Sequence, residues 1–155
     1  MQNIQSNCRA NDIHCALGLS QMTKLGTFVS AQNKLTEYYQ QWLKVLALIG
    51  QPIKRTENGR PAWHVSVALI DFERAGTDRA SVMNAPRKKG ISSQLLYIPF
   101  YRQPYYKRLY GAHRMAGAES YYACCLCLPF FTDVTLDDFN HIVGSLASVL
   151  SISAD

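Results

Sequence analysis

The sequence lacks the features that would place it in a membrane or in the secretory pathway. No apolar run approaches the roughly 20 residues that a membrane-spanning helix requires. The opening MQNIQSNCRAND has neither the basic start nor the apolar stretch of a signal peptide. These absences predict a cytoplasmic protein without a membrane partner.

Charge is also scarce, and it is scattered. Charged residues make up 17% of the 155 residues, and the net charge is +5. The basic residues cluster only briefly, as Lys54-Arg55, Arg87-Lys88-Lys89 and Lys107-Arg108, without a recognisable nucleic-acid motif. We therefore expect a solvated basic face and no nucleic-acid partner, and the low charge with nine tyrosines suits a surface partly buried against another body.

The cysteines and histidines are not arranged for disulfides or a metal. Five cysteines is an odd number, and Cys124, Cys125 and Cys127 stand too close for the spaced pairs of a secreted scaffold. The four histidines are dispersed, so nothing provides the second ligand pair of a zinc site. We expect reduced thiols that fill core gaps on a short helix, and no metal site.

The first third of the chain has a helical pattern. Residues 1–11 are expected to be a flexible lead-in, after which Asn11 or Asp12 can cap a helix over 12–49. Its apolar residues recur at helical spacing, in one long helix or in two broken near Gly26. Residues 50–62 contain two prolines and two glycines without a period, which predicts an exposed loop.

Residues 63–155 are predicted to form a small α/β unit. Strands are expected over 63–70 and 91–98, with a helix over 78–89 that Pro86 disturbs. Short helices are expected near 103–106 and over 119–127, and Thr135 begins the last helix. The fold class is α/β of the α+β type, a single domain in which a long N-terminal helix accompanies a small sheet covered by helices on one side.

Four stretches, in the same order and at similar spacing, resemble the DegT/DnrJ/EryC1/StrS sugar aminotransferases. The chain looks like the last two fifths of such an enzyme. The family pattern Asn-Tyr-Arg, followed by Asp-Ile-x-x-Ala-Leu-Gly, is similar to residues 7–18, and Gly-Ile-x-x-Gln-Val-His-Tyr-x-Pro is similar to residues 90–99. The other two are Gln103-Pro104-Tyr105-Tyr106 and the pair Ala118-Glu119 with Leu126-Cys127-Leu128-Pro129.

The resemblance implies the small C-terminal domain of a fold-type I aminotransferase that uses pyridoxal phosphate. Within the family the greatest likeness is to enzymes that aminate a 4-keto nucleotide sugar on the pathway to pseudaminic acid. The implied reaction moves an amino group from glutamate to a 4-keto-6-deoxy UDP-sugar. The implied assembly is a homodimer in which each active site is built from both subunits.

The resemblance also assigns roles to three residues. Asn7 matches the asparagine that reaches the cofactor phosphate of the neighbouring subunit, and Arg9 matches the arginine that faces the substrate phosphates. Tyr97 lies beside the position that borders the sugar. The residue types suit these roles, because an amide and a guanidinium both donate hydrogen bonds to phosphate.

The catalytic lysine of the family lies upstream of the part that this chain resembles. That lysine holds the cofactor and moves the proton, and none of the seven lysines here stands in a motif that replaces it. The expectation is that the chain has no catalytic residue, binds no cofactor covalently and is inactive alone. Its partner is then a second copy or the N-terminal half of an aminotransferase. The alternative is a non-catalytic module that docks onto a full-length enzyme.

The resemblance departs from the family pattern at three positions. Cys8 replaces a tyrosine, Leu96 replaces a histidine, and Pro86 stands where a helix former is expected. Leu96 removes a polar group from the expected substrate region. These changes leave two interpretations open, one piece of a split enzyme or an inactive remnant.

Overall fold

The computed structural model describes residues 9–46, 49–53, 59 and 61–150. Their elements are α1 (Asp12–Met22), α2 (Leu25–Val45), β1 (Gly50–Pro52), β2 (Ser66–Ile70), α3 (Arg79–Arg87), the 3-10 turn η1 (Phe100–Arg102), α4 (Pro104–Tyr110), α5 (Ala116–Cys124), β3 (Cys125–Leu128) and α6 (Leu136–Val149). This mixed α/β arrangement confirms the predicted fold class. Asn7 and Cys8 lie outside the described residues.

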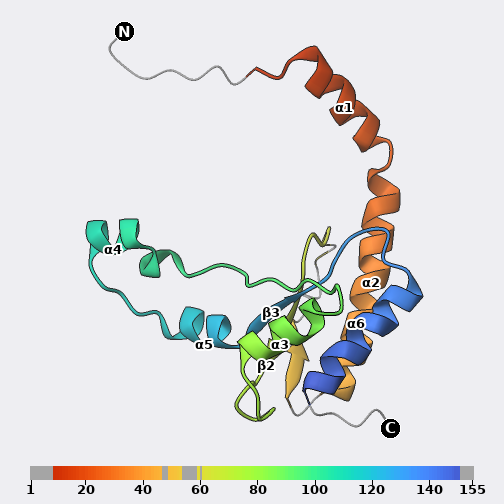
Figure 1. Ribbon diagram of the computed structural model, residues 1–155. Coiled ribbons are helices and arrows are strands. Elements are labelled where there is room, and N and C mark those ends of the chain that lie inside the picture. Colours follow the sequence, from red (N-terminus) through yellow and green to blue (C-terminus); the bar gives the residue numbers. More distant parts are fainter. Residues whose placement is uncertain (1–8, 47–48, 54–58, 60, 151–155) are drawn as a thin grey trace.

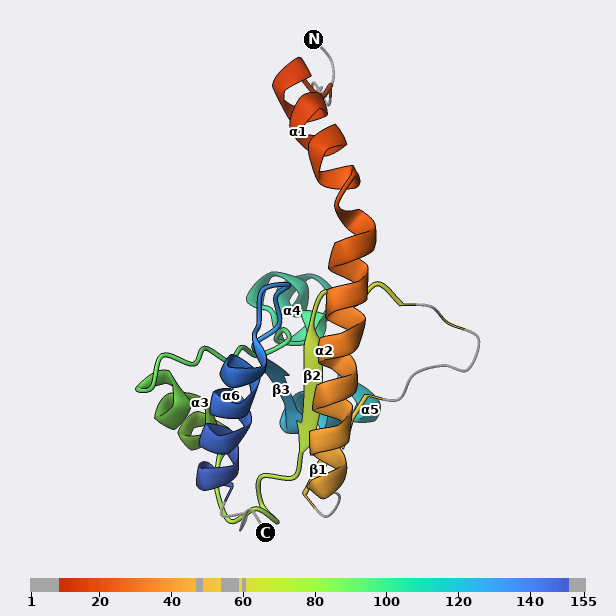
Figure 2. The same ribbon diagram turned by 90° about the vertical axis from the view of Figure 1, so that its right-hand side faces the viewer.

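The helical region at the start of the chain is divided into α1 and α2. Of the two alternatives, one long helix or two helices broken near Gly26, the second is confirmed. Asn11 caps α1 by accepting a hydrogen bond from the amide of His14 at 2.9 Å. The break falls at Thr23 and Lys24, just before Gly26, and the Thr23 hydroxyl donates to the Ser20 carbonyl at 2.7 Å. α1 buries no residue and projects away from the sheet, whereas the later turns of α2 lie along it (Figures 1 and 2).

The sheet has three antiparallel strands in the order β1-β2-β3. β1 pairs with β2 from Gly50 opposite Ile70 to Pro52 opposite Ala68, so the expectation of a loop over all of 50–62 was wrong at its start. Pro52 is tolerated because β1 is an edge strand and a proline can offer no amide to a ladder. Residues 54–58 and 60 of the expected loop lie outside the described part.

One face of the sheet carries the main core. Ala68 and Ile70 of β2 and Leu126 and Leu128 of β3 are all buried and belong to one cluster. Alternate residues of a strand point to the same face, so this cluster lies on one side of the sheet. The helices α2, α3 and α6 contribute the rest, including Leu35, Tyr39, Leu43, Val82, Phe139, Ile142 and Leu146. The predicted covering of one face by helices is confirmed.

The opposite face carries a smaller apolar cluster. Val67, Cys125 and Cys127 are buried there and pack against Leu95 and Leu96. The two buried cysteines fill space in this cluster, as expected, but they lie on a strand. The prediction of a helix over 119–127 was wrong after Cys124, because residues 125–128 pair with β2 and are buried on both faces.

The expected strand over 91–98 was also wrong. Only Gln94 forms an isolated bridge, in which its amide donates to the Cys127 carbonyl at 3.3 Å and its carbonyl accepts from the Cys127 amide at 2.8 Å. Gly90, at φ +80°, begins the segment, and Pro99 follows it. The segment therefore crosses the edge of β3 at one point instead of running along it.

Two helix termini match the sequence closely. Asp78 caps α3 by accepting from the amide of Ser81 at 2.9 Å, and Pro86 is buried in its last turn. Pro86 removes one backbone donor near the end of the helix, which ends at Arg87. Thr135 and Asp138 form a reciprocal capping box at the start of α6. Within the described residues, the helices are too short or too polar to cross a bilayer.

Candidate functional site

The segment after Gly90 places Tyr97 on the surface. Ile91 is buried and Gln94 is bonded to Cys127, so both hold the segment against β3. Three residues later the side chain of Tyr97 is 80% exposed. Its neighbour Leu96 packs against the smaller apolar cluster. Leu96 therefore serves the packing of this face of the sheet.

Tyr97 borders two hollows. The first has a volume of about 480 Å³ and a polar wall that includes His64, Lys89, Gln94 and His141. The second is a groove of about 590 Å³, lined mostly by aromatic side chains. Leu96 and Tyr97 line both of them. The predicted sugar-bordering residue therefore separates a polar hollow from an apolar groove, which suits recognition of a ligand with both characters.

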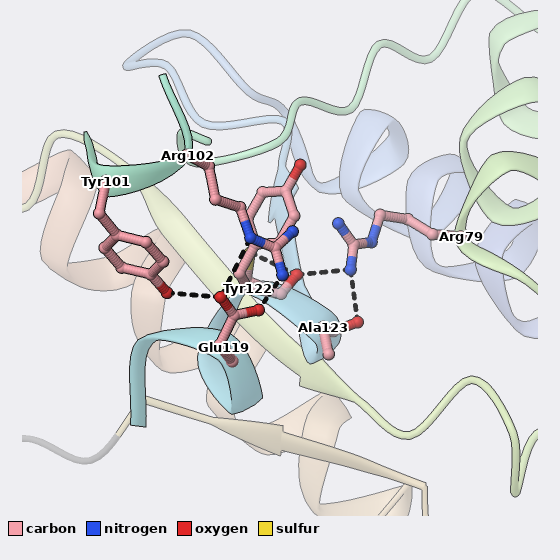
Figure 3. Close-up of polar contacts among 7 residues, drawn as sticks. Arg79, Tyr101, Arg102, Glu119, Tyr122 and Ala123 are labelled. Carbon is pink, nitrogen blue, oxygen red and sulfur yellow. Dashed lines mark hydrogen bonds and ion pairs between the residues drawn. The ribbon is translucent and has the colours of Figure 1, made fainter. Parts of the chain in front are cut away.

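A polar network (Figure 3) includes Tyr101, which also lines the aromatic groove. The Tyr101 hydroxyl donates to Oε1 of Glu119 at 2.8 Å, and Nε of Arg102 donates to the same oxygen at 3.1 Å. Nη2 of Arg102 pairs with Oε2 of Glu119. Because the guanidinium uses two nitrogens on two oxygens, the pair fixes the orientation of η1 against α5.

Arg79 reaches the same region from the start of α3. Its guanidinium donates to the carbonyls of Tyr122 and Ala123 at the end of α5, where carbonyls lack partners within the helix (Figure 3). The Arg79 guanidinium lies 5.2 Å from the centre of the Tyr122 ring, and that of Arg102 lies 5.1 Å from it. Two cations therefore share one aromatic ring, and they connect α3, η1 and α5.

The buried thiols near this site are not suited to nucleophilic work. Burial raises the pKa of the Cys127 thiol to about 11 and also raises the pKa of Cys125. A thiol reacts as its thiolate, so both are poor nucleophiles at neutral pH. In the described residues, the histidines, cysteines and acids form no group of three that could hold a metal ion.

Of the predicted site residues, the described part of the chain contains Arg9 and Tyr97, and it does not bring these two together. Asn7 lies outside the described residues, and Arg9 comes three residues before α1. The N-terminal end of α1 lies far from the sheet in both views (Figures 1 and 2), whereas Tyr97 packs beside β3. The described structure of one chain therefore places Arg9 and Tyr97 apart, and their shared role stays a prediction.

The sequence profile of the DegT/DnrJ/EryC1/StrS aminotransferase family matches residues 1–147. The chain belongs to this family. The spore coat polysaccharide biosynthesis protein SpsC of Bacillus subtilis strain 168 is 25% identical over 142 residues, which are 90% of this chain and 36% of SpsC. The chain thus spans little more than a third of the length of that relative.

Solved structures of other members share the fold. PseC from Helicobacter pylori, an aminotransferase involved in the biosynthesis of pseudoaminic acid, matches with a TM-score of 0.85 and 23% identity, over 97% of this chain and 40% of PseC. The pyridoxal phosphate form of the putative sugar aminotransferase Spr1654 from Streptococcus pneumoniae matches with a TM-score of 0.78 and 20% identity, over 94% of this chain and 37% of that one. At these identities the likeness shows the fold alone.

The Spr1654 structure is a pyridoxal phosphate form, so the described residues are compared with what this cofactor needs. The cofactor needs a lysine for its carbonyl carbon and an acid for its ring nitrogen. Lys89 and Lys107 each border a hollow that also holds an acid, Asp138 and Glu119 respectively. Asp138 is committed to the cap of α6 and Glu119 to Arg102, so neither hollow offers the pair. Neither of these two hollows therefore fits the cofactor.

The network of Figure 3 was missed by reasoning from the sequence. Glu119 belongs to one of the family-like motifs, but Arg102 lies 17 residues earlier and Arg79 lies 43 residues before Tyr122. No periodic pattern connects residues so far apart. The available signal was the Ala118-Glu119 pair itself, since an acid in an aromatic segment needs a cationic partner when it is partly buried.

Proposed function

We propose that the chain is the C-terminal part of a nucleotide-sugar aminotransferase that uses pyridoxal phosphate and is inactive alone. The reaction of the assembled enzyme would move an amino group from glutamate to a 4-keto-6-deoxy UDP-sugar. The observation that carries this proposal is the family match over residues 1–147, combined with hollows that contain no lysine with a free acid. In this proposal the catalytic lysine would come from another polypeptide segment.

Within such an enzyme the chain would contribute ligand contacts. Arg9 would donate to the phosphates of a nucleotide sugar and Asn7 to the cofactor phosphate, both in the active site of a neighbouring subunit. Tyr97 would border the sugar, since its exposed ring separates the polar hollow from the aromatic groove. α1 projects away from the sheet, which supports a contact between the N-terminal part of the chain and a neighbouring subunit (Figure 2).

Cofactor labelling tests the inactive state directly. The purified chain is mixed with pyridoxal phosphate, reduced with borohydride and digested for mass spectrometry. We expect only trace labelling spread over several lysines. Near-complete labelling of one lysine would overturn the proposal. The same experiment on the chain mixed with the lysine-bearing part of PseC, followed by an amino-transfer assay, tests whether a supplied partner restores activity.

A second candidate function is a docking module for a full-length aminotransferase, and α1 favours it. Its apolar side chains Ile13, Leu17, Leu19 and Met22 are 79%, 58%, 73% and 63% exposed. Apolar surface of this kind marks an interaction site. Sedimentation of the chain with and without PseC distinguishes the candidates, because docking onto the complete enzyme occurs only in the second. A stable monomer that does not bind PseC would exclude docking to this relative.

A further inference from the structure

A small basic hollow lies between α4 and the start of α5, outside the residues that the family resemblance assigns. It has a volume of about 350 Å³, near the lower end of the usual range for small-molecule sites. Four of its lining residues are basic: Arg102, Lys107, His113 and Arg114. Glu119 is the only acid among its lining residues. The hollow therefore concentrates positive charge in a chain whose basic residues are otherwise dispersed.

The acid in the hollow does not neutralise the other cations. Both oxygens of Glu119 are occupied, one by Tyr101 and Nε of Arg102 and the other by Nη2 of Arg102. The side chains of Lys107 and Arg114 form no hydrogen bond or ion pair with any described residue. Two full positive charges thus remain uncompensated at one concave place, where an anion would be attracted.

The backbone holds these two cations at the same hollow. Lys107 stands on α4, and Gly111 ends that helix at φ +79°, in the region that favours glycine. The ring of His113 then donates from Nε2 to the Tyr110 carbonyl at 2.7 Å, since a carbonyl can only accept. This contact fixes the turn that precedes Arg114. The turn brings Arg114 to the hollow that Lys107 borders.

We propose that this hollow is a binding site for a phosphate oxyanion, with Lys107 and Arg114 as its binding residues. Arginine supplies paired donors in a plane and lysine a compact charge, and both suit phosphate oxygens. The oxyanion can be free phosphate or pyrophosphate, or it can be part of a nucleotide. Tyr101 and His113 also line the aromatic groove, so a flat base attached to the phosphate would find rings next to it.

Calorimetric titration of the complete chain with pyrophosphate at low salt tests the site. The variant Lys107→Gln/Arg114→Gln is compared with Lys24→Gln/Lys44→Gln, which removes the same charge from exposed positions on and beside α2. We expect at least about tenfold weaker binding for the first variant and less than about twofold change for the second. Equal losses of affinity in both variants, or no binding of pyrophosphate by the natural chain, would overturn the proposed site. Thermal melts of both variants verify that they fold.

Titration with UDP and with uridine distinguishes the sources of the oxyanion. If UDP binds more tightly than pyrophosphate, and the Lys107→Gln/Arg114→Gln variant loses this binding, the ligand of the site is a nucleotide. If UDP and pyrophosphate bind with equal affinity, the ligand is a free oxyanion. Uridine binding that equals UDP binding would overturn the proposal, because the phosphates would then contribute nothing. The site does not rest on the proposed amino transfer, and these measurements need no cofactor or partner chain.

Discussion

The body formed by α2, the sheet and α6 differs from the two projecting parts, α1 and the segment that carries α4. In the body, alternate strand residues and one face of each helix are buried in a shared core. α1 and α4 bury no residue at all, although both contain large apolar side chains. The same kind of residue therefore stabilises the fold in one region and forms exposed surface in the other. Stability should reside in the body, and binding should reside in the projecting parts.

Removing a side chain from the body should have the largest effect. Leu126 of β3 is fully buried in the main core, so Leu126→Ala should lower the free energy of unfolding by about 2–5 kcal/mol. The matched change Leu19→Ala in α1, where the leucine is 73% exposed, should change it by less than about 0.5 kcal/mol. Urea denaturation measures both. Similar losses for the two variants would show that α1 is part of the cooperative unit.

Thiol chemistry gives a second measure of the same contrast. Cys15 is exposed on α1, whereas Cys127 is 7% exposed and its pKa is raised to about 11 by burial. At pH 8 the thiolate of Cys127 should be rarer than that of an ordinary cysteine by a factor on the order of 100.

Iodoacetamide labelling followed by peptide mass spectrometry checks this expectation. In a Cys8→Ser background, Cys15 should react first and Cys127 only after denaturant is added. Equal labelling of both in the folded chain would contradict the buried position of β3. The Cys15→Ser variant serves as the control, because it should remove the fast phase and leave the slow one.

Helix capping should have a smaller effect that again depends on the region. Thr135→Ala removes the hydroxyl that accepts from the Asp138 amide at 3.1 Å, and it should cost about 1 kcal/mol because α6 is part of the core. Asn11→Ala removes the equivalent cap of α1, but that helix buries nothing, so global stability should hardly change. Urea denaturation compares them, and Thr135→Ser should behave as the natural chain does. A larger loss of stability in Asn11→Ala than in Thr135→Ala would contradict the assignment of stability to the body rather than to α1.

The features that could be predicted from sequence are local ones. The Thr135 cap, the Asp78 cap and the strand containing Ser66–Ile70 depend on residues within a few positions of one another. β1 was missed because Gly50-Gln51-Pro52 has no strand propensity, and its extended form comes from pairing with β2. Residues 125–127 were misassigned because a short apolar run fits a buried strand or a helix equally well by its pattern.

The site shows the same limit. Tyr97 is exposed and lines a polar hollow, and its role stays a prediction. The hollow around Lys107 and Arg114 was not predictable, because it depends on the turn at Gly111 and on the pairing of Glu119 with Arg102. The pairing is a tertiary feature. Lys107 in the sequence appears only as part of a short basic cluster, which by itself indicates a solvated surface.

Acid should produce the smallest effect, and it should act on the body rather than on α1. Hydrogen bonds from the Thr135 hydroxyl and amide lower the pKa of Asp138, and those from the Ser81 amide and hydroxyl lower the pKa of Asp78. A carboxyl whose folded pKa lies below its unfolded value stabilises the fold above the unfolded pKa, near about 3.9. That contribution is lost as the pH falls through the folded pKa. Asn11, which caps α1, is an amide and does not titrate in this range.

Thermal melts are recorded between pH 6 and pH 2.5, in steps of about 0.5 pH units. The Tm should therefore decline below about pH 4. The Asp138→Asn variant should decline less steeply, because the asparagine amide has no proton to gain. Protection factors for amide exchange, corrected for the intrinsic rate at each pH, should fall over the same range in the first turns of α6 and α3, whereas the Asn11 cap of α1 gains no proton and should cause no such fall. A pH slope for Asp138→Asn identical to that of the natural chain would show that this capping box does not contribute to acid sensitivity.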